Sequence, residues 1–317
     1  MPLQINELLN ETTIRALRDP VLDAARGLPA SVYTSGEFFA REQDTLFPST
    51  WMGIAFDTDV PLVGDGLPLE ICGLPVILTR DDTGTVRVLH NVCRHRATIV
   101  LDAPCHGAKT FNCPYHGWVY GLDGALKATP FWDGTPDSHR MPVDADRNGL
   151  VPVRTGVWNP VVFVNLDGLA PPLNEYLAPM DAELAHLDIP DLDLAHRRDW
   201  SFKANWKLVM ENWEVYHHVW VHEGVFDRMS DEVNIKTGVP YTEMAADGNS
   251  LFLRYTPDRP GNRANNGLPP VPRRFEPTRA HSVANAVLPN TTVTISDTSY
   301  APAIYVPIAP GVTEARM

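Results

Sequence analysis

Two short segments of this 317-residue chain each bring one cysteine and one histidine together. The first reads Cys93-Arg94-His95, and 17 residues later the second reads Cys113-Pro114-Tyr115-His116. The chain has only four cysteines and eleven histidines, so four of these residues at such intervals indicate a metal centre rather than chance. This pattern constrains the fold, because two separate loops must meet at one point.

Two kinds of metal centre take two thiolates and two imidazoles. A structural zinc site is one alternative, because Cys₂His₂ is a common zinc ligand set. In zinc fingers, however, one loop usually supplies both cysteines and another segment both histidines. A mixed pair from each loop suits a two-iron cluster in which one iron takes two thiolates and the other takes two imidazoles.

The mixed pairs resemble those of a Rieske [2Fe–2S] domain, and residues 45–165 as a whole are similar to one. The resemblance implies that Cys93, His95, Cys113 and His116 hold the cluster. Respiratory Rieske proteins carry an extra cysteine in each ligand loop, and those two form a disulfide. Thr98 and Tyr115 stand at the corresponding places here, so the similarity is to the oxygenase type. We interpret Cys72 and Cys105 as non-ligands.

A second group of candidate ligands follows the segment Asn205-Trp206-Lys207. Glu214, His217 and His222 form a carboxylate-and-two-imidazole set that suits ferrous iron with open positions for oxygen. Glu214 and His217 lie about 60° apart around a helix, but His217 and His222 diverge by roughly 140°. Both histidines reach one metal only if the helix bulges or ends between them. His218 with His222 is the alternative pair, and a partly exposed helix with surface histidines is the alternative without a metal.

Together the two groups resemble the large (α) subunit of Rieske non-haem iron ring-hydroxylating oxygenases. The resemblance implies that His217 and His222 bind the mononuclear Fe(II). It also implies that Glu214 bridges, between subunits of a homotrimer, to His116 or His95 of a neighbouring cluster. Electrons from NAD(P)H would arrive through a separate ferredoxin or flavin reductase, and O₂ and a small organic molecule would be the substrates.

Three departures from that family pattern affect the assignment. Glu211-Asn212 stands one residue closer to the first histidine than the family motif has it, and the bridging acid is Glu where many aromatic-ring enzymes have Asp. The family's third iron ligand is an Asp in a helix beyond the two histidines, and Asp297 does not match its motif. Either the chain is truncated, or two histidines and water hold the iron, or another group replaces the Asp. We expect the C-terminal part of the catalytic domain to be truncated.

Fewer residues indicate the substrate. Glu at position 214 resembles the branch that acts on choline, carnitine or betaines, by hydroxylation or oxidative demethylation. Trp213, Tyr216 and Trp220 form an aromatic stripe that can cage a methylated cation, although such stripes more often pack in a core. Aromatic-ring dioxygenation or O-demethylation is the alternative reaction, and a Rieske electron-transfer protein without oxygenase activity is the alternative of another class.

Charge and hydropathy exclude some other classes. A formal net charge of −13 disfavours nucleic-acid binding, which needs clustered cations. No apolar run approaches the length of a membrane helix, and with few cysteines and no apolar leader we expect a cytoplasmic protein.

The fold class expected is α+β. Residues 1–44 are predicted to form N-terminal helices that pack on the catalytic domain, with Ser35 as a helix cap. Short apolar runs with Asp-Gly, Cys-Gly and Thr-Gly turns predict an all-β domain over residues 45–165. The resemblance implies that residues 166–317 form a helix-grip catalytic domain, whose antiparallel sheet lies over the iron helix. Its predicted elements are helices at 173–187 and 206–217 and strands at 198–203, 290–296 and 303–308, with a last strand that starts at Thr313 and leaves an exposed edge.

Overall fold

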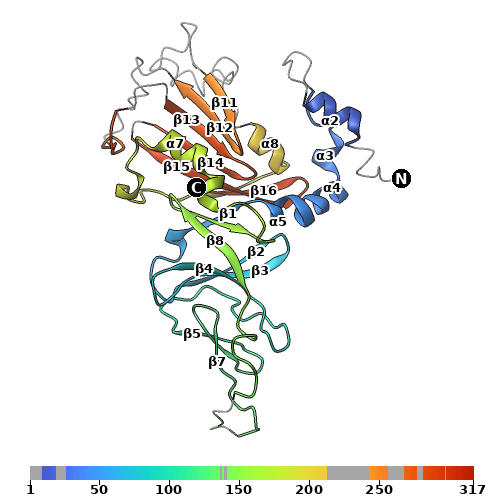
Figure 1. The fold of residues 1–317 in the computed structure, drawn as a ribbon, viewed down its shortest axis with the longest axis vertical. Coiled ribbons are helices and arrows are strands. Elements are labelled where there is room, and N and C mark those ends of the chain that lie inside the picture. Colours follow the sequence, from blue (N-terminus) through green and yellow to red (C-terminus); the bar gives the residue numbers. More distant parts are fainter. Residues whose placement is uncertain are drawn as a thin grey trace. The chain divides into compact units, whose positions relative to one another are not determined.

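The computed structural model describes residues 9–18, 26–135, 138, 141–212, 243–255, 268–276, 281–296 and 298–317. The chain forms two compact units, one of residues 47–170 and one that combines residues 1–46 with residues 171–317. Figure 1 shows the strands of each unit. The three domain ranges expected from the sequence stay a prediction.

The unit of residues 47–170 is built from two antiparallel sheets, as the apolar runs and turns predict. The larger has the order β1-β9-β8-β4-β3-β2 and the smaller the order β5-β6-β7. The strands of the larger sheet are β1 (Met52–Phe56), β2 (Gly66–Ile71), β3 (Leu74–Arg80), β4 (Val86–His90), β8 (Pro152–Trp158) and β9 (Val161–Asn165). The smaller sheet contains β5 (Thr110–Asn112), β6 (Val119–Gly121) and β7 (Leu126–Ala128). The helical turns are α5 (Phe47–Ser49) and η3 (Asp57–Asp59).

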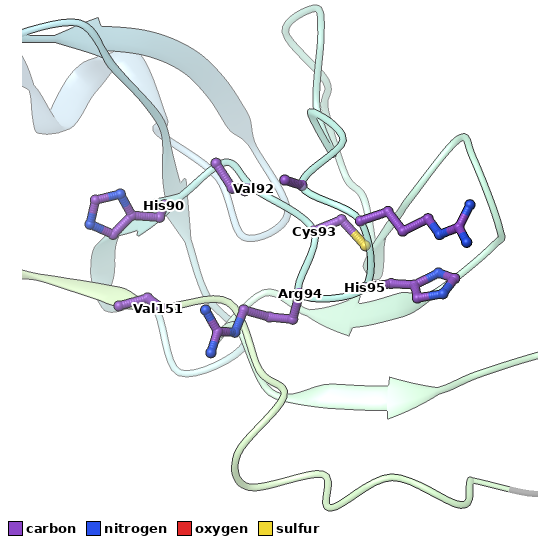
Figure 2. Close-up of a pocket in the computed structure, with 8 residues that line it drawn as sticks. His90, Val92, Cys93, Arg94, His95 and Val151 are labelled. Carbon is purple, nitrogen blue, oxygen red and sulfur yellow. The ribbon is translucent and has the colours of Figure 1, made fainter.

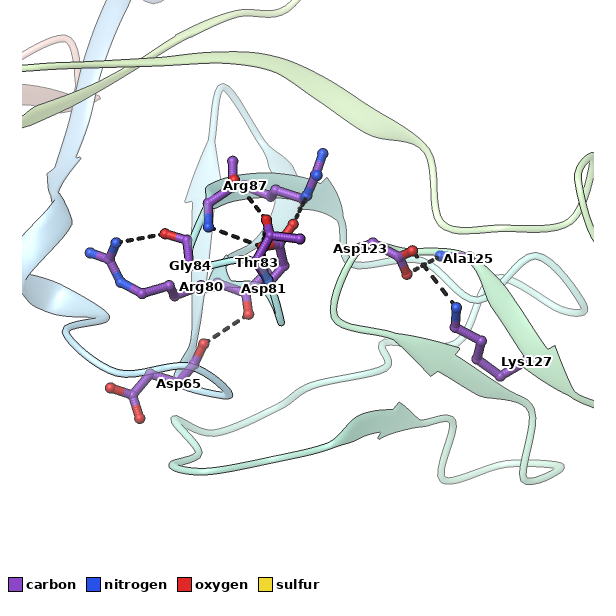
Figure 3. A network of polar contacts seen from close by, with 11 residues as sticks. Asp65, Arg80, Asp81, Thr83, Gly84, Arg87, Asp123, Ala125 and Lys127 are labelled. Carbon is purple, nitrogen blue, oxygen red and sulfur yellow. Dashed lines mark hydrogen bonds and ion pairs between the residues drawn. The ribbon is translucent and has the colours of Figure 1, made fainter.

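The tight turns of this unit follow the local sequence. Cys72 and Gly73 join β2 to β3 with φ angles of 51° and 74°. Two positive φ angles give the two-residue hairpin whose twist matches its strands. The turn between β3 and β4 is held by Asp81, whose carboxylate accepts hydrogen bonds from the backbone N–H groups of Thr83 and Thr85 and contacts the Arg87 guanidinium (Figure 3).

One buried cluster connects the two sheets. It gathers Ile77, Leu89, Cys93, Val100, Phe111, Cys113, Trp118, Tyr120, Leu122, Leu126 and Leu150. Apolar side chains from β3, β4, β5, β6 and β7 therefore surround the two cysteines that the sequence singles out. The loops that carry these cysteines are held by the core of the unit.

The other unit contains a seven-stranded antiparallel sheet with the order β10-β16-β15-β14-β13-β12-β11. Its strands are β10 (Asp199–Phe202), β11 (Glu243–Asp247), β12 (Ser250–Tyr255), β13 (His281–Val287), β14 (Thr291–Ile295), β15 (Tyr300–Ala309) and β16 (Val312–Arg316). The helices are α2 (Glu11–Leu17), α3 (Ser31–Thr34), α4 (Gly36–Arg41), the π-helical η2 (Glu42–Leu46), α6 (Leu173–Tyr176), α7 (Ala178–Leu184), η4 (Ile189–Asp191) and α8 (Trp206–Glu211). Helix α7 packs against β13, and α8 packs against β15 and β16. The α+β class is confirmed.

The strand that begins near Thr313 differs from the prediction. We expected it to be left unfinished at an exposed sheet edge. Strand β16 instead pairs with β10 on one side and with β15 on the other. Because β10 comes more than 100 residues earlier in the sequence, the local pattern around Thr313 contains no sign of it. The prediction of an unpaired edge here is wrong.

Two helix predictions are changed in detail. Ser35 caps α4 as expected, and its hydroxyl accepts a hydrogen bond from the N–H of Phe38 at 3.1 Å. The single helix expected over residues 173–187 is two short helices, α6 and α7, which meet at Leu177. No helix among the residues described above is long and apolar enough to cross a membrane.

Helix α8 is joined to the N-terminal segment by a buried polar network. The Nζ of Lys207 lies 2.7 Å from a Glu42 carboxylate oxygen, and both side chains are less than a tenth exposed. The indole N–H of Trp206 donates to the other oxygen of Glu42 at 3.1 Å. At the surface the Tyr33 hydroxyl donates to Glu211 at 2.7 Å. A buried charge that is paired and hydrogen-bonded is tolerated, whereas either partner alone is costly.

Candidate functional site

The two segments that carry the predicted cluster ligands form equivalent loops. In the first loop, the N–H of Cys93 donates to Thr98 O and the O of Cys93 accepts from the N–H of Ala97, both at 2.9 Å. The second loop repeats this pattern from Cys113 to Trp118 at 2.8 Å and from Gly117 to Cys113 at 3.0 Å.

The fourth residue after each cysteine has a positive φ angle. The angle is 55° at Ala97 and 69° at Gly117, so each loop turns back sharply at that residue. A left-handed conformation is easy for glycine but costs an alanine about 1–2 kcal/mol, so the fold must hold Ala97 in place.

The two thiols lie side by side in the core. Cys93 and Cys113 are 3% and 4% exposed, and their side chains are hydrogen-bonded to one another. Burial raises the pKa of the Cys113 thiol, and the N–H groups of Tyr115 and His116 act against it by hydrogen bonding. Such N–H groups stabilise a thiolate, which is the form that binds a metal.

The two imidazoles lie side by side and are more exposed than the thiols. The ring centroids of His95 and His116 are 4.5 Å apart, and His95 is exposed (Figure 2). Partial burial of the ring, with the charges of His116 and Arg96, lowers the pKa of His95. A neutral imidazole is available as a metal ligand.

The four side chains fit a two-iron cluster. Among the described residues, no three or more His, Cys, Asp or Glu side chains gather around one point where a single metal ion would sit. The predicted ligands form a buried pair of thiols and an outer pair of imidazoles. This grouping matches a cluster with one thiolate-bound and one imidazole-bound iron.

Two functional neighbours of the ligands were not identified from the sequence. The hydroxyl of Tyr120 lies 3.1 Å from Cys93 Sγ and accepts a hydrogen bond from the N–H of Arg94 at 3.0 Å. The indole of Trp118 stacks on His95, with centroids 5.1 Å apart and planes 6° from parallel. Both residues lie just after the second loop, and their aromatic character was the only signal in the sequence.

The segment between the ligand loops is attached to the start of β2 and to the loop that precedes it. The backbones of Gly66 and Cys105 exchange two hydrogen bonds of 2.9 Å. The buried carboxylate of Asp65 meets the exposed His106 ring at 3.0 Å. Cys105 is half-buried and packs against the core that contains Cys93 and Cys113, while Cys72 lies in the turn between β2 and β3. That both are non-ligands stays a prediction.

The predicted mononuclear iron site lies outside the described residues. This applies to His217, His218, His222, Glu214 and the aromatic residues Trp213, Tyr216 and Trp220, and also to Asp297. Helix α8, which precedes them, covers Trp206–Glu211 of the helix predicted over 206–217. Asn205 caps it by accepting from the N–H of Lys207 at 3.0 Å.

Two family models match the chain, one over the predicted cluster site and one over the predicted mononuclear iron site. Residues 50–138 match the Rieske [2Fe–2S] domain, and residues 189–317 match the catalytic domain of the ring hydroxylating alpha subunit.

The relatives that the chain matches include a choline monooxygenase and the oxygenase subunits of two other monooxygenases. The chain is 33% identical over 216 residues to choline monooxygenase of Atriplex hortensis, a match that covers 65% of this chain and 48% of that protein. The glycine betaine monooxygenase oxygenase subunit of Chromohalobacter salexigens is 32% identical, with 64% and 46% covered. The carnitine monooxygenase oxygenase subunit of Escherichia coli is 30% identical, with 63% and 53% covered. The chain thus spans about half the length of the curated relatives it matches.

Solved structures show the same fold. A quaternary ammonium Rieske monooxygenase with a bound inhibitor has a TM-score of 0.70 at 22% identity, over 92% of this chain and 74% of that one. Naphthalene 1,2-dioxygenase from Rhodococcus sp. also has a TM-score of 0.70 at 22% identity, over 97% and 76%.

Proposed function

Because this chain carries both domains of a Rieske-type ring-hydroxylating alpha subunit, we propose that it is the oxygenase component of a Rieske monooxygenase system. The observation that carries the proposal is that equivalent loops pair two buried thiols and two more exposed imidazoles. The reaction proposed is hydroxylation or oxidative demethylation of a small quaternary ammonium or N-methyl compound. The substrate class is supported by the choline, glycine betaine and carnitine monooxygenases among the relatives.

The chain supplies ligands and their hydrogen-bond partners. Cys93 and Cys113 would hold the inner iron of the cluster and His95 and His116 the outer one. His217 and His222 would hold a mononuclear Fe(II). When bound, these groups supply one-electron transfer and O₂ activation. The Trp118 indole stacks on the His95 ring and fixes its plane, while the Tyr120 hydroxyl is hydrogen-bonded to the sulfur of Cys93.

We propose a homotrimer that receives electrons from NAD(P)H through a separate ferredoxin or flavin reductase. In that assembly Glu214 of one subunit lies next to His116 of another. Inter-subunit electron transfer is named for a structural neighbour, the quaternary ammonium Rieske monooxygenase. A cytoplasmic location is proposed because none of the four cysteines forms a disulfide, and cytosolic proteins rarely contain disulfides.

The test begins with the purified protein. We expect about three irons per chain, visible absorption and the rhombic EPR signal of a histidine-ligated cluster. Cys113→Ser should abolish the absorption, and Cys105→Ser should leave it unchanged. A protein that is colourless and contains zinc contradicts the proposal.

Oxygen consumption then defines the reaction. With a reductase present, we expect consumption that depends on choline, carnitine, γ-butyrobetaine or glycine betaine rather than on aromatic compounds. An intact cluster with no substrate-dependent consumption from either panel identifies an electron-transfer protein instead.

A further inference from the structure

Three buried polar side chains in the middle of the seven-stranded sheet have an oxygen without a hydrogen-bond partner in the part of the chain that the structure describes. These oxygens are the hydroxyls of Ser250 on β12 and Thr291 on β14 and the amide oxygen of Asn285 on β13. All three residues are 0% exposed. The amide nitrogen of Asn285 donates to the O of Val293 at 3.3 Å, which sets the orientation of the amide. We call Ser250, Asn285 and Thr291 the polar triad.

The strand register places the polar triad on one face of the sheet. Val287 on β13 stands opposite Ser250 on one side and opposite Thr291 on the other. Side chains that stand opposite one another in antiparallel strands share a face, and so do side chains two residues apart along a strand. Asn285 is two residues from Val287 and therefore shares the face of Ser250 and Thr291.

Helix α7 covers this face of the sheet. It packs against β13 (Figure 1). Arg254, four residues after Ser250 on β12, shares the face, and its guanidinium lies 2.7 Å from the carboxylate of Glu183 on α7. Met180 and Leu184 of α7 are 0% and 3% exposed, so an apolar layer lies over the strands. A polar oxygen in such a layer is destabilising without a partner, because folding removes its hydrogen bonds to water.

The members of the polar triad are too far apart to satisfy one another. Neighbouring strands lie about 4.8 Å apart, so the backbones at Ser250 and Thr291, with β13 between them, are separated by about 10 Å. A hydrogen bond joins atoms about 3 Å apart, and one water molecule joins two oxygens up to about 6 Å apart. At least two water molecules are therefore needed to connect all three groups. A cation suits the site less well, because the triad has no carboxylate to balance its charge.

We propose that the polar triad binds at least two buried water molecules between α7 and strands β12, β13 and β14. A water molecule donates to the amide oxygen of Asn285, which can only accept, and exchanges hydrogen bonds with the hydroxyls of Ser250 and Thr291. Buried waters typically make about three hydrogen bonds to polar groups that have no other partner. The site goes beyond the proposed function and does not depend on it.

Removal of one hydroxyl tests the proposal through the sign of its effect on stability. Thr291→Val keeps the shape of the side chain. If water binds there, the change removes a hydrogen bond and the urea midpoint falls. If the hydroxyl has no partner, the change removes an unsatisfied group and the midpoint stays or rises. Thr294→Val is the matched control for the strand preference of valine, because Thr294 lies on the other face of the same strand and is partly exposed. We expect a lower midpoint for Thr291→Val than for Thr294→Val, and an equal or higher one overturns the proposal.

A crystal structure of the full-length wild type shows the water molecules directly. We expect electron density for ordered water within hydrogen-bond distance of all three oxygens of the polar triad. Side chains that instead pair directly with protein groups, or a face packed without water, overturn the proposal. This measurement also decides the question if Thr291→Val fails to fold. The visible spectrum of the cluster should be unchanged in both threonine variants, because the triad lies in the other unit. A missing cluster spectrum in the wild type counts against the proposed function alone, so the two failures are distinguishable.

Discussion

At the scale of single residues, neighbours of the ligands determine how the site behaves. Tyr120 is fully buried and meets the sulfur of Cys93, and its hydroxyl also accepts from the N–H of Arg94. Such hydrogen bonds to ligand sulfur are among the factors that set the potential of an iron–sulfur cluster. The sequence predicts the four ligands from their spacing, but Tyr120 is 27 residues from Cys93 and only the folded chain joins them.

Replacing Tyr120 by phenylalanine tests this role. We expect Tyr120→Phe to keep the cluster but shift its midpoint potential to a more negative value, because electron density on the sulfur is no longer drawn into a hydrogen bond. The unpartnered N–H of Arg94 should also lower the free energy of unfolding by about 1–3 kcal/mol. Potentiometry measures the shift, with Tyr305→Phe in the other unit as the control. An unchanged potential contradicts this role.

The lowered pKa of Asp81 predicts that the stability of the protein depends on pH. Burial by itself raises the pKa of this carboxyl, but hydrogen bonds from Thr83, Thr85 and Arg87 outweigh it and lower the pKa to about 2. A pKa below the unfolded value of 3.8 means that Asp81 contributes stability above about pH 4. That contribution, roughly 2 kcal/mol, is lost as the pH falls from about 4 to about 2.

The corresponding variant is Asp81→Asn. We expect it to be less stable than the wild type at pH 7, with a difference that narrows toward pH 2. Urea unfolding across this range measures both proteins. A difference that stays constant with pH assigns the loss to packing rather than to the carboxylate.

At the scale of elements, the backbone of Gly64 lies close to the backbone of Ala108. This close approach sets the position of the segment between the two ligand loops. Gly64 has a φ angle of 86°, and a Cβ atom there would lie 2.4 Å from the O of Ala108. Gly84 has nearly the same φ angle, 81°, with nothing within 4 Å of its Cβ position. The same substitution at these two glycines therefore separates backbone strain from steric contact.

We expect Gly84→Ala to cost about 1 kcal/mol, through its positive φ angle alone. Gly64→Ala should cost more, because the backbone of Ala108 must move away and carry the segment between the ligand loops with it. Urea unfolding gives the two costs, and the rate of cluster loss to a chelator reports on the segment. Equal costs at the two sites contradict this account.

At the scale of the whole molecule, one unit is continuous along the chain and the other is not. The unit of residues 47–170 is one continuous stretch that contains all four predicted cluster ligands together with Trp118 and Tyr120. The other unit combines residues from both sides of it. In that unit Glu42, from the N-terminal segment, pairs with Lys207 on α8.

This organisation predicts that residues 47–170 fold alone and bind the cluster. We expect the isolated fragment to show the visible and EPR spectra of the full chain, because every described contact of the ligands lies within it. The full chain without residues 1–46 should keep those spectra but lose stability in its other unit, because Lys207 loses its buried partner. A fragment that folds but has no cluster spectrum contradicts the prediction.

The sequence by itself predicted the candidate cluster site, because Cys93, His95, Cys113 and His116 form two mixed pairs of the kind that suits a two-iron cluster. Local patterns also determined the hairpin at Cys72 and Gly73 and the cap at Ser35, since a turn or a cap depends on a few adjacent residues. Only the tertiary structure decided which distant groups meet. The Tyr120 hydroxyl at Cys93, the Glu42 carboxylate at Lys207 and the pairing of β16 with β10 each join residues that are far apart in the chain. No periodicity or spacing within one segment encodes such contacts, because they form only when sheets and helices pack.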